Sequence, residues 1–219
     1  MTQNPSLIKK LWRNHWTSAS LFERMLLIAI FLAFSFSVQQ ISSGVYIKAK
    51  AQLAQHLLNR AWVQTTANDA PQKPWPWADT WPVAKLNVPR LNKQIVVLKG
   101  ASGQAMAFAP GHMAGTPAPG GNGTTIYAAH RDTHFRFLQH VKRGDQVNVS
   151  TPDGKQHSYR VTGTEIVKAD TSGIDPNMPG KKLALVTCYP FGARLPGPLR
   201  YVVHAEAIER HSNLSKNLN

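Results

Sequence analysis

Apolar side chains are distributed in two contrasting ways along the chain. The segment Met25–Val38 is a run of 14 uncharged, mostly apolar residues, whereas the chain beyond about residue 80 alternates apolar and polar positions in short stretches. As a helix the run spans only about 21 Å, against about 30 Å for the hydrocarbon core of a bilayer. Continued to Ile47, it covers 23 residues and about 34 Å. The pattern therefore predicts one transmembrane helix over residues 25–47.

A cleaved signal peptide is the alternative interpretation of this segment, because a charged start followed by a short apolar run is typical of both. The Ala-x-Ala triplet at residues 49–51 lies well past the apolar run and among charged residues. An uncleaved anchor is therefore expected. The positive-inside rule places the N-terminus in the cytoplasm and the remainder outside it, because the span is preceded by Lys9, Lys10, Arg13 and Arg24.

Two further segments, together residues 48–80, lie between the anchor and the alternating region. Apolar positions from Ile47 to Gln64 fall at helical spacing without Gly or Pro, which predicts a juxtamembrane helix that continues the anchor. Prolines and tryptophans then mark a linker: Pro71, Pro74, Trp75, Pro76, Trp77, Trp81 and Pro82. This linker has three interpretations: an aromatic belt at the membrane interface, a segment packed on the folded domain, or a lid over its cleft.

Beyond the linker the hydrophobic period becomes two, which is the spacing of a strand with one buried face. Runs rich in Val, Ile, Tyr and Thr recur, without long helical patterns between them, at residues 81–88, 94–99, 124–129, 146–151, 157–168, 183–187 and 200–209. Seven or eight strands in about 130 residues predict a mainly β domain over residues 81–210, built as a small closed barrel or a sandwich.

Turn signals separate the predicted strands. Asp153-Gly154 predicts a two-residue hairpin turn of the primed type, in which Gly supplies a positive φ. Surface loops are expected in the Gly- and Pro-rich residues 110–123 and in residues 170–180 and 191–198. Residues 211–219 are interpreted as a polar tail.

Composition narrows the classes of function. Hydrophobic residues make up 42% of the 219 residues and aromatic residues 9%, which is enough to bury a core and excludes a disordered or collagen-like chain. Lys and Arg number 25 against 11 Asp and Glu, for a formal net charge of +14, so an anionic neighbour such as nucleic acid or anionic lipid is expected. Because most of the chain is predicted to lie outside the cytoplasm, nucleic acid is set aside as a partner and a membrane surface is favoured.

The chain contains one cysteine, Cys188, which excludes an intrachain disulfide. It follows the run 183–187, where it is either a small buried hydrophobe or a nucleophile. A nucleophilic thiol needs a base or cation beside it, because the thiolate is the reactive form. His130 follows the run 124–129, and Arg200 begins the last run. An imidazole and a guanidinium near the thiol would suit acyl transfer, with Arg200 supporting an oxyanion or holding the substrate.

The residues around His130 carry further signals. His130 and His134 have the outer spacing of a zinc-binding helix, but Arg131 stands where that motif has its glutamate, so no metal is expected. His134 and His140 are interpreted as surface residues. Asp132 either orients His130 or pairs with a nearby arginine on the rim of the site.

Three segments, in this order, resemble motifs of the sortase family. Residues 127–135 (YAAHRDTHF) resemble its histidine segment, residues 184–188 (ALVTC) its T-L-x-T-C signature, and residues 199–203 (LRYVV) its terminal arginine strand. Residues 74–86 (PWPWADTWPVAKL) are similar to the sortases of Gram-negative bacteria, the proteobacterial class. The resemblance covers roughly residues 81–210.

The resemblance implies an eight-stranded barrel that acts as a cysteine transpeptidase, an endopeptidase-like enzyme of the hydrolase class. Cys188 would attack the Thr-Gly bond of a Leu-Pro-x-Thr-Gly-like (LPXTG) sorting signal and form a thioester. His130 would serve as general acid and base, and Arg200 would support the oxyanion. The one departure from the signature, Ala184 in place of Thr, leaves the nucleophile intact and removes a hydroxyl near the site.

The resemblance also implies the partners of the enzyme. The substrate would be a protein with a C-terminal sorting signal, an amine would accept the acyl group, and no cofactor would be required. Thr187, Asp170 and Ser172 would contact the substrate, although the loop that begins at Asp170 has an ordinary connector as its other interpretation. With the predicted anchor, the chain would be a single-pass inner-membrane protein with its catalytic domain in the periplasm. The rival interpretation is a non-catalytic, membrane-tethered β-barrel that binds peptide or anionic lipid, with Cys188 merely packed.

Overall fold

The computed structural model of the protein consists of two compact units, residues 1–52 and 53–219. The residues that it describes are 20–68, 70–193, 195 and 197–208. One long helix, α2 (Leu21–Asn68), contributes to both units, and the described strands lie in the second unit. The predicted polar tail and the basic residues before residue 20 lie outside the described residues.

Helix α2 begins with a pair of reciprocal hydrogen bonds. Ser20 N donates to Glu23 Oε2 at 2.7 Å, and Glu23 N donates to Ser20 Oγ at 3.3 Å. This is the capping box that a Ser followed three positions later by Glu encodes. In the first unit the helix carries the apolar run with its side chains exposed, for example Phe31 at 67%. An 18-residue window has a mean hydropathy of 2.0, so this helix is long and apolar enough to cross a membrane.

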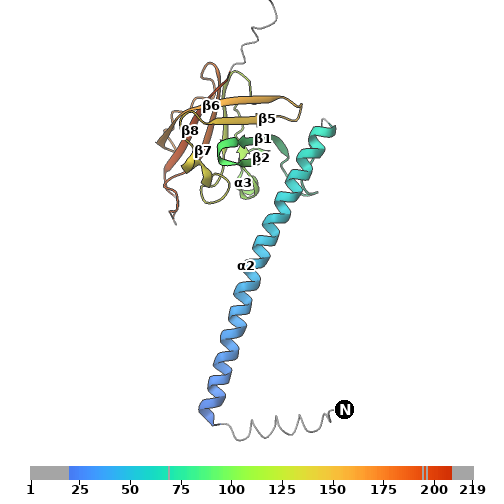
Figure 1. Cartoon of the computed structure of the whole chain (residues 1–219), viewed down its shortest axis with the longest axis vertical. Helices are drawn as coiled ribbons and strands as arrows, with labels where there is room; N and C mark the ends of the chain where they lie inside the picture. The colour runs from blue at the N-terminus through green and yellow to red at the C-terminus, as the bar shows by residue number, and fades with distance from the viewer. Residues whose placement is uncertain (1–19, 69, 194, 196, 209–219) are drawn as a thin grey trace, which may run out of the picture. The chain divides into compact units, whose positions relative to one another are not determined.

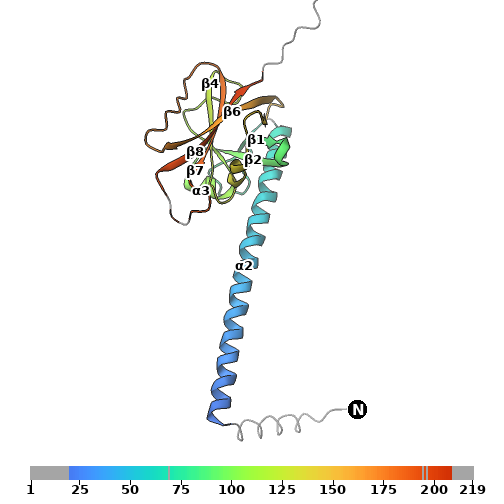
Figure 2. The same ribbon diagram turned by 60° about the vertical axis from the view of Figure 1, so that its left-hand side comes forward.

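The strands of the second unit form a closed barrel in the order β1-β2-β3-β4-β7-β8-β6-β5 (Figures 1 and 2). They are β1 (Pro82–Val88), β2 (Lys93–Lys99), β3 (Gly111–His112), β4 (Gly123–Ala128), β5 (Gln146–Ser150), β6 (Gln156–Lys168), β7 (Lys181–Cys188) and β8 (Leu199–Ala207). Short helices connect some of them: η1 (Pro89–Leu91), α3 (Gly103–Phe108) and η2 (Arg136–His140). The predicted mainly β, closed barrel is confirmed, and each predicted run forms a strand.

The parallel pair β4 and β7 is buried on both faces. Tyr127 and Leu185 lie in the inner core, where complete burial raises the pKa of the Tyr127 hydroxyl well above its ordinary value. Ile126 and Ala184 lie in a second buried cluster, packed with Val202 of β8. Two buried faces explain why these strands carry nearly continuous apolar runs. Ala184, the departure from the signature, therefore contributes to an apolar contact.

The short strand β3 lies at the start of residues 110–123, where the sequence predicts a surface loop and no strand. Gly111 pairs with Leu98 of β2 on one side and with Ala128 of β4 on the other. A Cβ atom on Gly111 would lie 2.1 Å from the carbonyl oxygen of Gly100, so a side chain at this position would collide with the backbone. A strand of two residues is too short to show a hydrophobic period, which is why the sequence pattern does not reveal it.

The hairpin between β5 and β6 corrects the predicted primed turn. Gly154 has a φ of 76°, but Asp153 is not among the described residues with positive φ. A primed turn with Asp153 at its first central position would require positive φ there. Instead, Gly154 N donates to Thr151 O at 3.1 Å and Thr151 N donates to Lys155 O at 2.9 Å. The loop is therefore three residues long and ends in the left-handed glycine.

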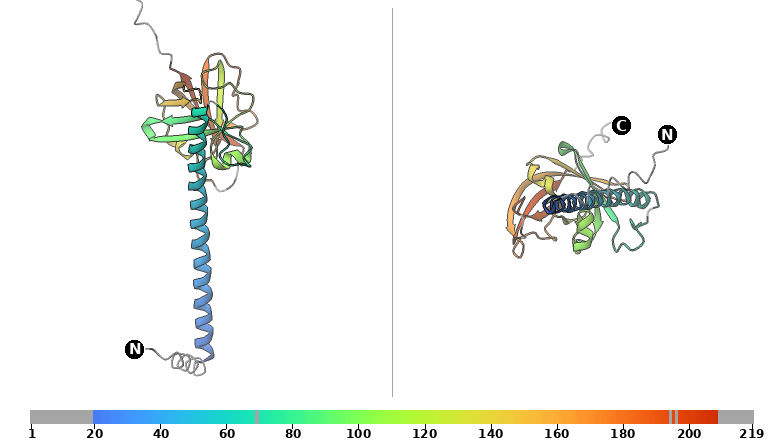
Figure 3. Two further views of the ribbon diagram at one scale, coloured as in Figure 1. Left: turned by 90° about the vertical axis from the view of Figure 1, so that its right-hand side faces the viewer. Right: turned by 90° about the horizontal axis from the view of Figure 1, so that it is seen from below.

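The last turns of α2 belong to the second unit and lie beside β2 and α3 (Figures 2 and 3). Leu58 and Trp62 share a buried cluster with Leu98. Trp75, from the linker, packs edge-on against Phe108 of α3 with 4.8 Å between ring centroids. This part of the chain thus adds an apolar layer outside the barrel.

The linker also packs at its other end. Lys99 lies over the ring of Trp81, 4.3 Å from its centroid, and Thr80 Oγ1 donates to Lys99 O at 2.7 Å. Trp77 is 83% exposed. Of the three interpretations of the linker, packing on the domain describes Trp75 and Trp81.

Candidate active site

Strands β4 and β7 run parallel, so their carboxyl ends lie at the same edge of the barrel. Ala128 pairs with Val186, and Ala129 N extends the ladder by donating to Val186 O at 3.2 Å. His130 is the next residue after Ala129, and Cys188 is the last residue of β7. The fold thus brings two candidate residues that are far apart in sequence to neighbouring strand ends.

Thr187 joins these two strand ends. Its side chain is buried, with 2% of its surface exposed, and its hydroxyl donates to the carbonyl oxygen of Ala129 at 2.7 Å. The residue before Cys188 is therefore hydrogen-bonded to the residue before His130. The hydroxyl that the sequence assigns to substrate contact is in this structure a link between β4 and β7.

Arg200 lies directly opposite Cys188 on the antiparallel pair β7 and β8. Directly opposed residues of such a pair present their side chains on the same face of the sheet. The Nη1 atom of Arg200 donates to Gly197 O and to Leu199 O, each at 2.9 Å. The guanidinium is half-buried and is held by the chain that leads into its own strand.

An aromatic cluster follows the thiol along the chain. Cys188 is free and half-buried. Tyr189 stacks on Tyr201 of β8 with centroids 6.3 Å apart, and Phe191 meets Tyr201 edge-on at 5.2 Å. Phe191 also packs against the inner core. The thiol is therefore partly open to water, which a fully buried cysteine would not be.

The two histidines of the segment after β4 have different surroundings. His130 is exposed, and its carbonyl oxygen accepts from Phe135 N at 3.1 Å. His134 is half-buried rather than a free surface residue. Burial lowers the pKa of its imidazole, a hydrogen bond to the backbone of Ala107 opposes that change, and the charge of His130 lowers the pKa further. His134 thus tethers the segment to α3, whereas His140 is exposed as expected.

Asp132 follows the second of its two sequence interpretations. Its carboxylate is 62% exposed and pairs with Arg131, with 3.5 Å between Oδ2 and Nε. The structure records this arginine contact on an exposed rim.

Arg131 has a structural role that the sequence pattern does not predict. Only 6% of its surface is exposed, and its Nη2 donates to Ala193 O at 2.5 Å and to Leu195 O at 2.9 Å. Both acceptors lie between β7 and β8, in the loop that joins Cys188 to Arg200. Sequence alone carries no signal for this contact, because arginine side chains are mostly exposed and the pattern here favours a surface position.

Asp170 and Ser172, the other predicted substrate contacts, lie in the loop after β6. Lys168, the last residue of β6, pairs with Leu199, and Ala169 N donates to Pro198 O at 2.8 Å. The loop therefore begins beside the start of β8. Asp170 is exposed and Ser172 is half-buried.

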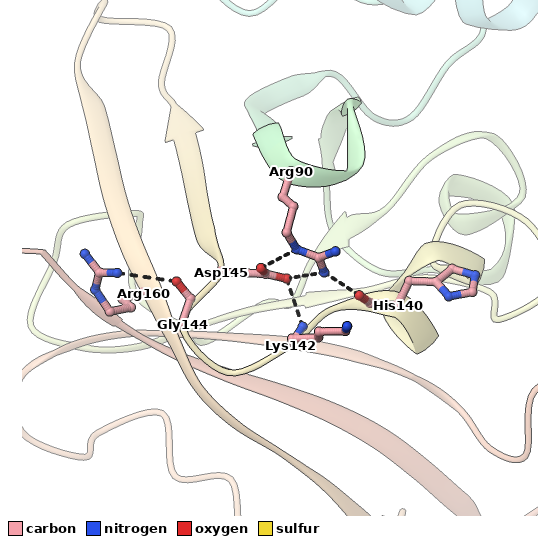
Figure 4. Close-up of polar contacts among 6 residues, drawn as sticks. All are labelled: Arg90, His140, Lys142, Gly144, Asp145 and Arg160. Atoms are coloured by element: carbon pink, nitrogen blue, oxygen red, sulfur yellow. Dashed lines mark hydrogen bonds and ion pairs between the residues drawn. The ribbon is translucent and has the colours of Figure 1, made fainter.

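An ion pair between Arg90 and Asp145 holds residues 140–145, which follow the histidine segment in the chain (Figure 4). Arg90 of η1 binds Asp145 through Nε to Oδ1 at 2.5 Å and through Nη2 to Oδ2 at 2.7 Å. The same Nη2 donates to His140 O at 2.5 Å, and Lys142 N donates to Asp145 Oδ2 at 2.8 Å. The hydrogen bond from Arg90 is the main cause that lowers the pKa of the buried Asp145 carboxyl. The ion pair and the bond to His140 O thus join η1, the end of η2 and the residue before β5.

Among residues 20–68, 70–193, 195 and 197–208, no group of three or more His, Cys, Asp and Glu side chains could hold a metal ion.

Comparisons with known proteins concern the barrel region of the chain. The family model for the sortase domain matches residues 86–208. Sortase D from Bacillus subtilis (strain 168) is 31% identical over 124 residues, which are 56% of this chain and 62% of that protein. The match thus spans less than two thirds of the length of that relative.

Solved structures share the fold. Sortase A from Corynebacterium diphtheriae is 22% identical with a TM-score of 0.55, covering 63% of this chain and 65% of that one. A Clostridium perfringens sortase D5 transpeptidase is 20% identical with a TM-score of 0.58, covering 72% of this chain and 99% of that one. Sortase C-1 from Actinomyces oris is 25% identical with a TM-score of 0.53, covering 59% of this chain and 74% of that one.

Proposed function

The chain belongs to the sortase family, and from this premise we propose that it is a membrane-anchored cysteine transpeptidase. It would cleave a Leu-Pro-x-Thr-Gly-like sorting signal on a substrate protein and transfer the acyl fragment to an amine. The candidate span in α2 supports anchoring. The basic residues before that span support a barrel outside the cytoplasm, and we propose an inner-membrane position with the barrel in the periplasm.

The observation that carries this proposal is the convergence of three strand ends. The hydrogen bond from Thr187 to Ala129 joins the residues that precede Cys188 and His130, and Arg200 faces Cys188 across β7 and β8. A thiol, a base and a cationic hydrogen-bond donor on one barrel edge are the parts that acyl transfer through a thioester requires.

Acylation would proceed in two steps, the formation and the collapse of a tetrahedral intermediate. The Cys188 thiolate attacks the threonine carbonyl of the signal, and the carbonyl π electrons move to oxygen to give a tetrahedral oxyanion. Arg200 would stabilise this oxyanion with its guanidinium N–H groups. As the oxyanion collapses, the peptide C–N bond breaks and the His130 imidazolium donates its proton to the departing amine. The products are a thioester on Cys188, a free glycine amine and neutral His130.

Transfer would reverse this sequence with a different amine. The incoming amine attacks the thioester carbonyl while neutral His130 takes its proton. Collapse of the second tetrahedral intermediate breaks the C–S bond and releases the Cys188 thiolate beside the His130 imidazolium. Asp170 and Ser172 lie in the loop beside the start of β8, and we propose that this loop borders the bound signal.

The experiment that tests the proposal compares the full-length chain in detergent with its Cys188→Ser variant. Each protein is incubated with a fluorogenic Leu-Pro-x-Thr-Gly peptide and an excess of triglycine. The parent is expected to cleave the peptide and to form the triglycine product, and the variant is expected to do neither. Equal turnover by both proteins would contradict Cys188 as the nucleophile. No turnover by the parent on any sorting peptide of this class would favour the non-catalytic peptide- or lipid-binding barrel instead.

A further inference from the structure

Two guanidinium groups bind backbone carbonyl groups in the loop between β7 and β8 and at the first residue of β8. Arg131 donates to the carbonyl oxygens of Ala193 and Leu195, and Arg200 donates to those of Gly197 and Leu199. Arg131 thus holds the middle of the loop, and Arg200 holds its end, where β8 begins.

We propose that Arg131 is a positioning residue, which sets the place of Arg200 relative to Cys188 by fixing the loop that joins them. The inference rests on the proposed function, because it concerns the alignment of that site. Arg131 follows His130 directly in the chain. The Arg131 side chain thus connects the segment that carries His130 with the loop between Cys188 and Arg200.

The surroundings of the loop explain why a hydrogen-bonding side chain is needed. A pocket of about 310 Å³ separates part of the loop from η2, lined by Arg131, Asp132, Arg136, Gln139, Phe191 and Gly192. A loop that faces a pocket has less side-chain packing to fix it than one that lies on the core. The hydrogen bonds from Arg131 supply the constraint that packing does not.

The chemistry of the residue supports the same conclusion. Only 6% of the Arg131 surface is exposed, and its Nη1 atom has no hydrogen-bond partner among the described residues. Burying a charge with an unpaired donor is unfavourable for folding, and apolar replacements of buried ionic groups are often neutral or stabilising. A planar fork also reaches two carbonyl groups in a way that a lysine ammonium does not. Arginine at this position is therefore better explained by alignment of the site than by stability.

The test is a double-mutant cycle in the full-length chain in detergent, with Arg131→Lys, Arg200→Lys and their combination. Arg131→Lys is expected to lower kcat/KM for the sorting peptide about 10- to 100-fold, the range that a misplaced reactive group produces. If Arg131 acts through Arg200, the combined variant is expected to lose no more than about threefold beyond Arg200→Lys alone. Fully multiplicative losses, or full activity of Arg131→Lys, would overturn the proposal.

Matched controls separate alignment from folding. Arg136→Lys alters a neighbouring exposed arginine of the same pocket and is expected to retain activity within about twofold. Thermal unfolding is measured for every variant, and Arg131→Gln replaces Arg131→Lys if the latter does not fold. A loss of activity that follows the loss of thermal stability across the variants would assign Arg131 a purely structural role.

Hydrogen exchange gives a reading that does not depend on activity. The amides of Tyr189 and Ala193 donate within the loop, to Leu199 O and Pro190 O. Arg131→Lys is expected to raise the exchange rate of peptides covering residues 189–193, while peptides from the β5–β6 hairpin stay unchanged. Unchanged exchange in the loop would overturn the positioning role even if the enzyme were active. Inactivity of the parent with an altered loop exchange would defeat the proposed function alone.

Discussion

The three side chains proposed for catalysis differ in how far water reaches them. His130 is exposed, whereas Cys188 and Arg200 are half-buried on opposed strands. An exposed imidazole can exchange protons with solvent and with an incoming amine, and a half-buried thiol can be covered by a bound peptide. His134, four positions on, is tied to the backbone of Ala107 and is held neutral more readily by burial. The two histidines are therefore suited to different tasks.

Replacing each histidine with alanine tests this assignment. His130→Ala is expected to lower the rate of thioester formation about 100- to 10,000-fold, the range for loss of a general acid and base. His134→Ala is expected to keep thioester formation within about tenfold and to lower thermal stability, because it removes a tether rather than a proton donor. Mass spectrometry of enzyme and sorting peptide, with the reaction quenched at successive times, measures the rate of thioester formation in both variants. Equal losses in the two variants would mean that the wrong histidine was chosen.

The pairing of β4 with β7 is the structural element on which the site depends. Its apolar runs are readable in the sequence because both faces are buried. The long-range partner of each strand is not readable in this way, since parallel pairing leaves no local turn signal. The bond from Thr187 to Ala129 shows the same limit, because a threonine beside a predicted nucleophile is equally expected to face the substrate or another strand.

Thr187→Val tests whether this junction matters. The substitution keeps the shape of the side chain but leaves the buried Ala129 carbonyl without its donor, so it is expected to lower the free energy of unfolding by about 1–3 kcal/mol. Thr187→Ser keeps the hydroxyl and is the matched control, with a smaller expected loss. Urea unfolding of both variants measures the difference. A Thr187→Val protein as stable and as active as the parent would contradict the role of the junction.

The Arg90–Asp145 pair makes a prediction about acid. Because Arg90 lowers the pKa of Asp145 in the folded chain, the carboxylate stabilises the fold at pH values above its unfolded pKa of about 3.9. That stabilisation is lost as the pH falls through the lowered folded pKa. Asp145→Asn is therefore expected to be less stable than the parent at pH 7, with a difference that shrinks below about pH 4. Urea unfolding from pH 2.5 to pH 7 measures this, and a difference that does not change with pH would contradict it.

A second carboxylate provides the comparison for that experiment. Asp153, beside Lys155 in the β5–β6 hairpin, is fully exposed, and the lysine hydrogen bond lowers its pKa to about 2. Exposed pairs of this kind contribute little to stability. Asp153→Asn is therefore expected to unfold at nearly the same urea concentration as the parent.

Sequence patterns reveal long elements and hide short or buried polar ones. The strands flanking Asp153 have a clear period, the run before Cys188 is nearly continuously apolar, and the capping box at Ser20 has a local code. β3 has only two residues, and its pairing depends on the close approach of Gly111 to a distant backbone. The contacts of Arg131 cannot be predicted from the sequence for a related reason. Its acceptors are backbone carbonyl groups whose positions are set only by the folded loop.

The whole chain combines a helix with a candidate membrane span and a barrel of the sortase family. Its net charge of +14 is expected to favour an anionic membrane surface. The basic residues before the candidate span predict that the barrel lies outside the cytoplasm.

Reporter fusions test this topology. An alkaline phosphatase fused after residue 60 is expected to be active, because that enzyme folds only outside the cytoplasm, where its disulfides form. The same reporter fused after residue 20, ahead of the span, is expected to be inactive. An inactive fusion after residue 60 would reverse the proposed orientation, and release of the domain by a signal peptidase would show instead that the segment is cleaved.

The most direct measurement of the central claim is the intact mass of the full-length chain trapped with a sorting peptide in the absence of an acceptor amine. The account predicts an added mass equal to the peptide through its threonine, less one water, located on Cys188 by fragmentation and absent from Cys188→Ala. A parent protein that binds the peptide but never gains this mass, or gains it at another residue, would contradict the account.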